Sequence, residues 1–150
     1  MKGCETLENL WCNWDKCKKL IPPTRGIYQI VAPSGMSIYF SPEIKGHPAT
    51  DAYDVSVLEN KYEKTNHSQF LYIGKAEGAK GLRQRIRQYL LYGFDTGNSH
   101  RGGRAIFQIK NFEKLICEWE EFEDCSAIEH QRLKVFSAEY AVYPIANWRG

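Results

Sequence analysis

Residues 26–31 read GIYQIV and residues 70–74 read FLYIG, and these two stretches decide the fold that the sequence predicts. Both are short, apolar and rich in β-branched and aromatic residues, which favours strands. The second stretch is apolar throughout and ends in glycine, which is typical of a central strand. Each stretch carries one tyrosine, Tyr28 in the first and Tyr72 in the second.

Between the two stretches the chain changes character twice. Pro33-Ser34-Gly35 predicts a turn into a second β-rich run at 36–40, so we expect a hairpin there. Residues 41–69 are polar and contain Pro42, Gly46 and Pro48, which indicates an irregular insertion with a short helix near 55–62. The whole insertion spans about 36–69.

Helical and strand periodicities account for the rest. Apolar residues at helical spacing predict an amphipathic helix over the first twenty residues, a second helix over 81–92 and a last helix from Ser126 to about 141. Residues 115–122 alternate and predict an edge strand. The expected fold is α+β: a small central antiparallel or mixed β-sheet flanked by helices, with an N-terminal helical extension at 1–24 and one domain at 25–150.

Composition limits the class of protein. A chain of 150 residues with 43% hydrophobic side chains can bury the core of a single domain. No run approaches the ~18 apolar residues of a membrane span, and the charged start is not a secretory signal, so we expect a cytoplasmic or nucleoid-associated protein that is not secreted. Five cysteines without a C-x-x-C pair argue against a disulfide framework and a common zinc site.

Charge is unevenly distributed along the chain. The net charge is only +2, yet residues 75–104 carry seven basic side chains against two acidic ones, and residues 113–124 carry six acids and one lysine. This pattern predicts a polarised surface with one face suited to phosphates.

The ordered motifs resemble those of the GIY-YIG nuclease superfamily over about residues 25–147. Either tripeptide alone is weak evidence, but both in order on expected strands form a specific pattern. The motifs are Gly26-Ile27-Tyr28, Tyr72-Ile73-Gly74-Lys75-Ala76, Leu82-Arg83-Gln84-Arg85, Glu129 in a helix and Pro144-Ile145-Ala146-Asn147.

The resemblance implies a stand-alone, restriction-type endonuclease that hydrolyses phosphodiester bonds of double-stranded DNA, site-specifically or not, with Mg²⁺ or Mn²⁺ as cofactor. A homodimer is compatible with it. Two alternatives stay open: a non-catalytic nucleic-acid-binding module of the same fold, and a structure-specific repair nuclease. By position, Tyr28 orients or activates water, Tyr72 is its hydrogen-bonding neighbour, Arg85 binds phosphate, Glu129 binds the metal, and Lys75 and Asn147 lie near the site.

The residues themselves support these roles unevenly. Glu129 shares a helical stripe with Leu133 and Phe136, and an inward carboxylate needs a partner such as a metal ion. Ser126-Ala127-Ile128-Glu129 also fits a capping box, in which the Glu129 side chain reaches back to the helix start. Arg85 and Arg83 flank opposite sides of one stripe, so periodicity cannot choose between them, and the resemblance selects Arg85.

Further residues are candidates for DNA contact. His100 to Arg104 combine basic groups with flexible glycines, although solvated charge explains them equally well, and a solvated position is also expected for Arg87. Tyr89 stands where some members of the superfamily have histidine. The insertion, longer than in most members, offers His47, Asn60, Asn66 and Gln69 as base readers. The candidate nucleic-acid-binding set is Arg83, Arg87, His100, Arg101 and Arg104.

Overall fold

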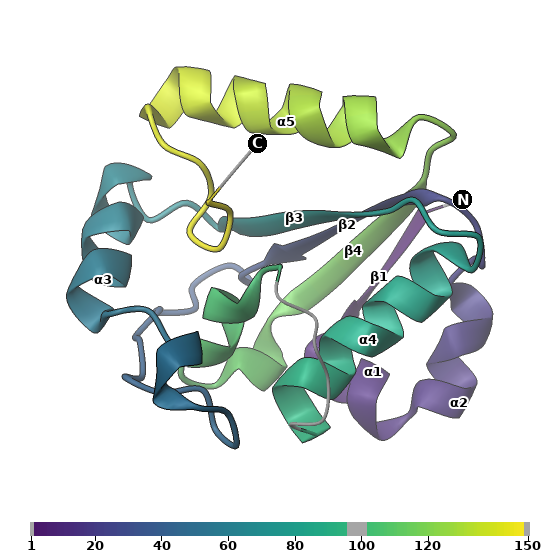
Figure 1. Cartoon of the computed structure of the whole chain (residues 1–150), viewed down its shortest axis with the longest axis horizontal. Coiled ribbons are helices and arrows are strands. Elements are labelled where there is room, and N and C mark those ends of the chain that lie inside the picture. Colours follow the sequence, from purple (N-terminus) through teal and green to yellow (C-terminus); the bar gives the residue numbers. More distant parts are fainter. Residues whose placement is uncertain (1, 96–101, 149–150) are drawn as a thin grey trace.

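The computed structural model describes residues 2–95 and 102–148, and their fold is α+β, as predicted (Figure 1). Four strands form one antiparallel sheet in the order β1-β4-β2-β3. The strands are β1 (Lys2–Thr6), β2 (Gly26–Val31), β3 (Phe70–Ala76) and β4 (Ile116–Glu121).

Helices cover both faces of this sheet (Figure 1). Helix α5 (Cys125–Tyr140) lies on one face, and α4 (Gly81–Asp95) lies on the other with α1 (Leu7–Cys12) and α2 (Trp14–Cys17) beside it. Helix α3 (Val55–Lys64) stands near the C-terminal segment, away from α2. Short 3₁₀ turns at Lys18–Leu20, Ala49–Asp51, Arg104–Gln108 and Phe112–Lys114 connect these elements.

Strand alternation divides the core into two layers. Tyr28 and Tyr72 point to the α4 face, where they pack with Leu82, Ile86 and Tyr89 of that helix. Ile27 and Ile73 of the same strands point to the α5 face, where they pack with Cys125 and Leu133. Both motif tyrosines therefore belong to the α4 layer.

The N-terminal segment is part of the sheet, so the prediction of one helix over the first twenty residues is wrong for its first part. Lys2–Thr6 is a strand paired with β4, and the helical periodicity describes the chain only from Leu7 onward. Thr6 marks the change, because its hydroxyl accepts from the backbone N–H of Asn9 at 3.1 Å and caps α1.

This extra strand changes the place of the others. β4, predicted as an edge strand, is internal because β1 pairs with its outer side. β3, predicted as a central strand, lies at the edge. Its apolar sequence reflects the helices that cover both of its faces and does not require a strand on each side.

The outer edge of β3, which no other strand of the described residues pairs with, is covered by the C-terminal segment. The side-chain amide of Asn147 donates to the carbonyl of Ile73 and accepts from its backbone N–H, both at 2.9 Å. The backbone N–H of Ala146 donates to the carbonyl of Leu71 at 3.0 Å. Asn147, expected near the site, thus pairs with the backbone of the edge strand in the way that a neighbouring strand would.

The insertion is a folded part of the domain. The predicted hairpin is wrong: residues 36–39 form no strand, and Phe40 makes only an isolated bridge to Ile109. β2 already has a partner on each side, so it has no free edge for a third strand. The predicted helix is confirmed as α3, and Ile44 and Leu58 are buried in the core.

The residues considered as base readers lie in different environments. The side chain of His47 is only 5% exposed, its Nε2 lies 2.6 Å from the carbonyl oxygen of Tyr92, and its ring stacks on that of Tyr92. Gln69 donates to the carbonyl of Ala32 at 3.1 Å. Asn60 and Asn66 are exposed. His47 is therefore a packing residue, which polar composition alone does not reveal.

We predict that Asn147→Ala lowers the free energy of unfolding by about 2 kcal/mol, because both backbone groups of the buried Ile73 lose their partner. Urea denaturation of the variant and wild type measures this difference. Asn60→Ala, an exposed change of the same kind within α3, serves as the control and is expected not to lower the free energy of unfolding, because alanine is the better helix former. Equal stability of Asn147→Ala and wild type would contradict the edge-covering role.

Candidate functional site

A hollow of about 460 Å³ opens at the edge of the sheet, at the end of β3 and between α4 and α5. It brings together five of the six residues expected at the site and leaves Asn147 outside. Its lining is Tyr28, Tyr72, Gly74, Lys75, Ala76, Glu77, Gly78, Gly81, Gln84, Arg85, Gln88 and Glu129.

Gly74 determines how Tyr28 reaches this hollow. The two residues lie opposite each other in the β2–β3 register. A Cβ atom on residue 74 would stand 2.6 Å from the Tyr28 hydroxyl oxygen, closer than real contacts allow. Only glycine therefore lets the Tyr28 ring lie across β3, with its hydroxyl near the edge.

Three tyrosines form the floor of the site. The rings of Tyr28 and Tyr72 meet edge to face with centroids 5.9 Å apart, and Tyr72 stacks on Tyr89 at 5.7 Å. The hydroxyl of the buried Tyr89 donates to the carbonyl of Gly103 at 2.9 Å. Gly103 has a φ of +70° and packs under the Tyr72 ring, where a side chain would collide. Tyr89, which stands where some members of the superfamily have histidine, is thus a packing residue of the floor.

The two motif tyrosines differ in acidity and exposure. Burial is the main cause that raises the pKa of Tyr28 well above its ordinary value and the pKa of Tyr72 to about 12. The hydrogen bond between the two hydroxyls raises the pKa of Tyr28 and lowers that of Tyr72. Nearby Arg85 lowers both pKa values. Both tyrosines line the hollow, and Tyr72, with 6% exposure against none for Tyr28, is the more accessible of the two.

The structure separates the two arginines that periodicity could not. Arg85 lines the hollow, and its guanidinium donates to the side chain of Gln88 at 3.2 Å. Arg83 lies outside the lining and donates through Nε to the carbonyl of Ile21 at 2.9 Å. Arg85 therefore faces the tyrosines, while Arg83 ties α4 to the segment that follows α2.

Lys75 and Glu129 form the opposite wall, on the α5 side of β3. The Lys75 ammonium donates to Ser126 Oγ at 2.7 Å and to Glu77 Oε1 at 2.8 Å, and it lies 4.0 Å from Glu129 Oε1. The side chain of Glu129 is 17% exposed. Burial raises the pKa of the Glu129 carboxyl, an effect that Lys75 partly offsets.

The capping-box interpretation of Ser126 and Glu129 does not hold. Helix α5 begins one residue earlier than expected, and Asp124 is its N-cap, accepting from the N–H of Ala127 at 3.3 Å. The Ser126 hydroxyl bonds to Lys75 instead. Glu129 is thus left facing the hollow.

Sequence reasoning missed three polar lining residues, Glu77, Gln84 and Gln88, and also Ser126, which bonds to the lining residue Lys75. Two of them carry a signal in the sequence. Glu77 follows Lys75 by two positions, so both side chains leave the strand on one side, and Ser126 precedes Glu129 by three, so both share a helix face.

The other basic candidates take part in contacts within the chain. The Arg87 guanidinium lies 5.0 Å from the Trp11 ring and 5.2 Å from the Trp14 ring, so its expected solvated position is wrong. The Arg104 guanidinium lies 5.0 Å from the ring of Tyr53. His100 and Arg101 lie outside the described residues.

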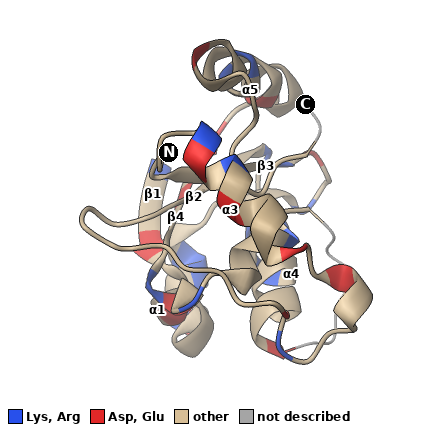
Figure 2. Cartoon of the chain, turned by 90° about the vertical axis from the view of Figure 1, so that its left-hand side faces the viewer, with Lys and Arg blue, Asp and Glu red and all other residues tan. Residues whose placement is uncertain are grey.

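Basic and acidic residues are interspersed on α3 (Figure 2).

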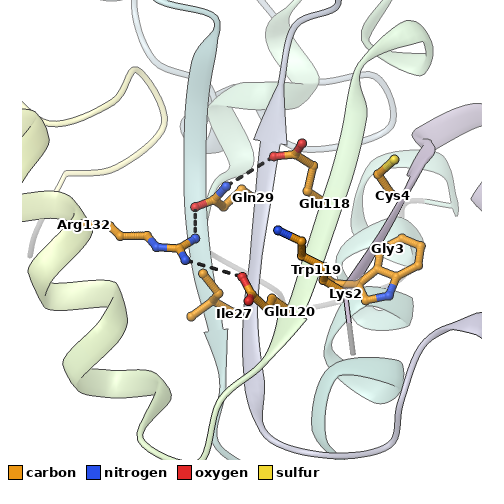
Figure 3. A pocket seen from close by; sticks show the side chains of 9 residues that line it. All are labelled: Lys2, Gly3, Cys4, Ile27, Gln29, Glu118, Trp119, Glu120 and Arg132. Carbon is orange, nitrogen blue, oxygen red and sulfur yellow. Dashed lines mark hydrogen bonds and ion pairs between the residues drawn. The ribbon is translucent and has the colours of Figure 1, made fainter.

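A second hollow, of about 350 Å³, lies on the α5 side of the sheet over β4 and β1 (Figure 3). Four of its polar side chains, Arg132, Gln29, Glu118 and Glu120, form one network. Arg132 donates to Gln29 Oε1 at 2.7 Å and lies 3.5 Å from Glu120, and Gln29 donates to Glu118 at 3.3 Å. This network joins α5 to the sheet, and it offers neither the tyrosines nor the arginine of the first hollow.

Glu129 fits the role of a ligand to a hard divalent cation. Its carboxylate is mostly buried, and no hydrogen bond from within residues 2–95 and 102–148 reaches it. The same part of the chain contains no cluster of three His, Cys, Asp or Glu side chains suited to a metal ion. The fit is therefore to an ion held by one carboxylate together with oxygens of the substrate and water.

Comparisons with models of protein families, with curated proteins and with solved structures find no match to this chain. Within the described ranges no helix has the length and apolar character needed to cross a membrane.

We predict that Glu129→Gln stabilises the protein at neutral pH when divalent cations are absent. Because the folded-state pKa of Glu129 is raised, the carboxylate form is disfavoured in the fold. Wild type therefore loses stability relative to the variant as pH rises through the carboxyl range. Thermal unfolding at about pH 8 should show the higher melting temperature for Glu129→Gln, and the gap should close near about pH 3.

Glu120→Gln is the matched control for this measurement, since Glu120 lies beside Arg132 of the same helix but outside the first hollow. It should give no such gain. If Glu129→Gln is less stable than wild type at pH 8, the fold does not disfavour the Glu129 carboxylate and the raised pKa is contradicted.

Proposed function

We propose that this protein is a metal-dependent endonuclease that hydrolyses phosphodiester bonds of double-stranded DNA. One observation carries the proposal: five side chains suited to this chemistry, from four different elements, meet in one hollow at the edge of the sheet. They are Tyr28 of β2, Tyr72 and Lys75 of β3, Arg85 of α4 and Glu129 of α5.

Arg85 supplies the phosphate contact. Its guanidinium faces the hollow on the α4 side, where it also lowers the pKa values of both tyrosines. A guanidinium remains charged at any ordinary pH and can neutralise the charge that develops on a phosphoryl group. Lys75 adds a second cation on the opposite wall, so a phosphate in the hollow lies between two positive groups.

Tyr72 positions the attacking water, and Tyr28 orients Tyr72. With its pKa raised to about 12, the Tyr72 hydroxyl is protonated at neutral pH and acts as a hydrogen-bonding group, not as a strong base. Tyr28 is more deeply buried and is hydrogen-bonded to Tyr72, which restrains the direction of the second hydroxyl. The expected role of Tyr28 is thereby shared between the two tyrosines.

Glu129 would hold the divalent cation, Mg²⁺ or Mn²⁺. When bound, such an ion supplies Lewis-acid stabilisation of phosphate and leaving-group oxygens. The protein contributes a carboxylate that projects from α5 and is largely withdrawn from water, which strengthens its attraction for a cation.

We predict that the protein nicks supercoiled plasmid with Mg²⁺ and not with EDTA, and that Arg85→Ala lowers the nicking rate by about 10²-fold or more. Arg83→Ala, two residues earlier on the same helix, should keep most of the rate, because Arg83 bonds to the Ile21 carbonyl outside the hollow. Gel analysis of plasmid forms over time measures both rates.

Equal losses in the two variants would show that Arg85 has no special part in catalysis. If wild type binds the plasmid but shows no Mg²⁺-dependent nicking, a non-catalytic nucleic-acid-binding module is favoured instead. A strong preference for branched over intact duplex DNA would favour a repair-type nuclease.

A further inference from the structure

Lys75 is held among three acceptors, and the contacts are unequal. Its ammonium makes hydrogen bonds to Ser126 Oγ at 2.7 Å and to Glu77 Oε1 at 2.8 Å. The third acceptor, Glu129 Oε1, is 4.0 Å away and beyond hydrogen-bond range. Two of the three ammonium protons are thus used on groups other than Glu129.

Lys75 makes its hydrogen bond to the more exposed of the two carboxylates. The side chain of Glu77 is 54% exposed, whereas that of Glu129 is 17% exposed. A carboxylate withdrawn from water gains more from a neighbouring cation than an exposed one. Electrostatic attraction alone would therefore place the Lys75 ammonium on Glu129.

Chain geometry explains the arrangement. Lys75 and Glu77 are two positions apart at the end of β3, so their side chains leave on the same side. Ser126 lies one helical turn before Glu129 on α5, and its hydroxyl is the closer of the two to the ammonium. The three groups together, Lys75, Glu77 and Glu129, carry a formal charge of −1, and the less accessible carboxylate is the one without a hydrogen bond to the lysine.

We infer that Glu77 and Ser126 are positioning residues that hold the Lys75 ammonium away from Glu129 and so keep the Glu129 carboxylate open to a divalent cation. This inference rests on the proposed function, which makes Glu129 the metal ligand. An ammonium within hydrogen-bond distance of Glu129 would occupy a carboxylate lone pair and neutralise its charge. It would therefore compete with the cation for the same oxygen.

Two variants test the inference through Mn²⁺ binding, measured by the loss of the free-ion electron paramagnetic resonance signal. Glu77→Gln should weaken binding about fivefold and Ser126→Ala about twofold. Ser126→Ala changes no charge and puts a good helix former into the first turn of α5, so its effect cannot come from a lost negative charge or a lost helix.

The same two changes are then made in a Lys75→Met background. If Glu77 and Ser126 act through the lysine, neither change should affect Mn²⁺ binding once the ammonium is gone. Glu120→Gln, which removes a carboxylate beside an arginine of α5 outside this hollow, is the control and should bind Mn²⁺ as wild type does.

Glu129→Gln separates failure of the inference from failure of the proposed function. If wild type binds no Mn²⁺, or if Glu129→Gln binds it equally well, the metal site is wrong and the inference falls with it. If Glu129→Gln abolishes binding while Glu77→Gln or Ser126→Ala leaves it unchanged, the inference alone is overturned. An effect of Glu77→Gln that persists without Lys75 also overturns it, because Glu77 would then act on the cation directly.

Discussion

The close packing of the Tyr28 ring on Gly74 is the contact on which the site depends. A Cβ atom at position 74 would collide with the ring, so the absence of a side chain there lets a residue of the second strand reach across the edge strand. Tyr72 and Tyr89 then complete an aromatic floor beneath the hydroxyls. Since this floor also belongs to the main hydrophobic core, the geometry of the hollow and the stability of the domain are coupled.

The edge position of β3 allows both faces of the sheet to contribute to one hollow. The tyrosines and Arg85 come from the α4 side, while Lys75 and Glu129 come from the α5 side. In an internal strand, the neighbouring strand would separate these two sets. An open edge also invites association with other chains, and here the Asn147 amide covers it at Ile73, next to the residue where the hollow begins.

The strands of the two tyrosine motifs, helix α4 and helix α5 were predictable because each carries a strong local signal, such as the buried stripe of Leu82, Ile86 and Tyr89. The strand at Lys2–Thr6 was not, since KGCET has little β character and is fixed only by pairing with β4. Because this strand was not predicted, β4 was expected at the edge of the sheet and β3 in its interior, the reverse of the structure. For the site, motif order selected Arg85 over Arg83, but the contacts of Lys75 with Glu77 and Ser126 depend on how β3 and α5 approach, which spacing along the chain does not determine.

The central claim is that the hollow at the edge of β3 performs phosphodiester hydrolysis, with Tyr72 facing the attacking water. Its most direct test is the rate at which Tyr72→Phe nicks supercoiled plasmid in Mg²⁺, compared with Tyr39→Phe, which alters a tyrosine that is 64% exposed and outside the hollow. The change removes one oxygen and keeps the ring in its stack. The account predicts a loss of about 10²-fold or more for Tyr72→Phe with folding intact and no loss for Tyr39→Phe. Equal rates for Tyr72→Phe and wild type would contradict it.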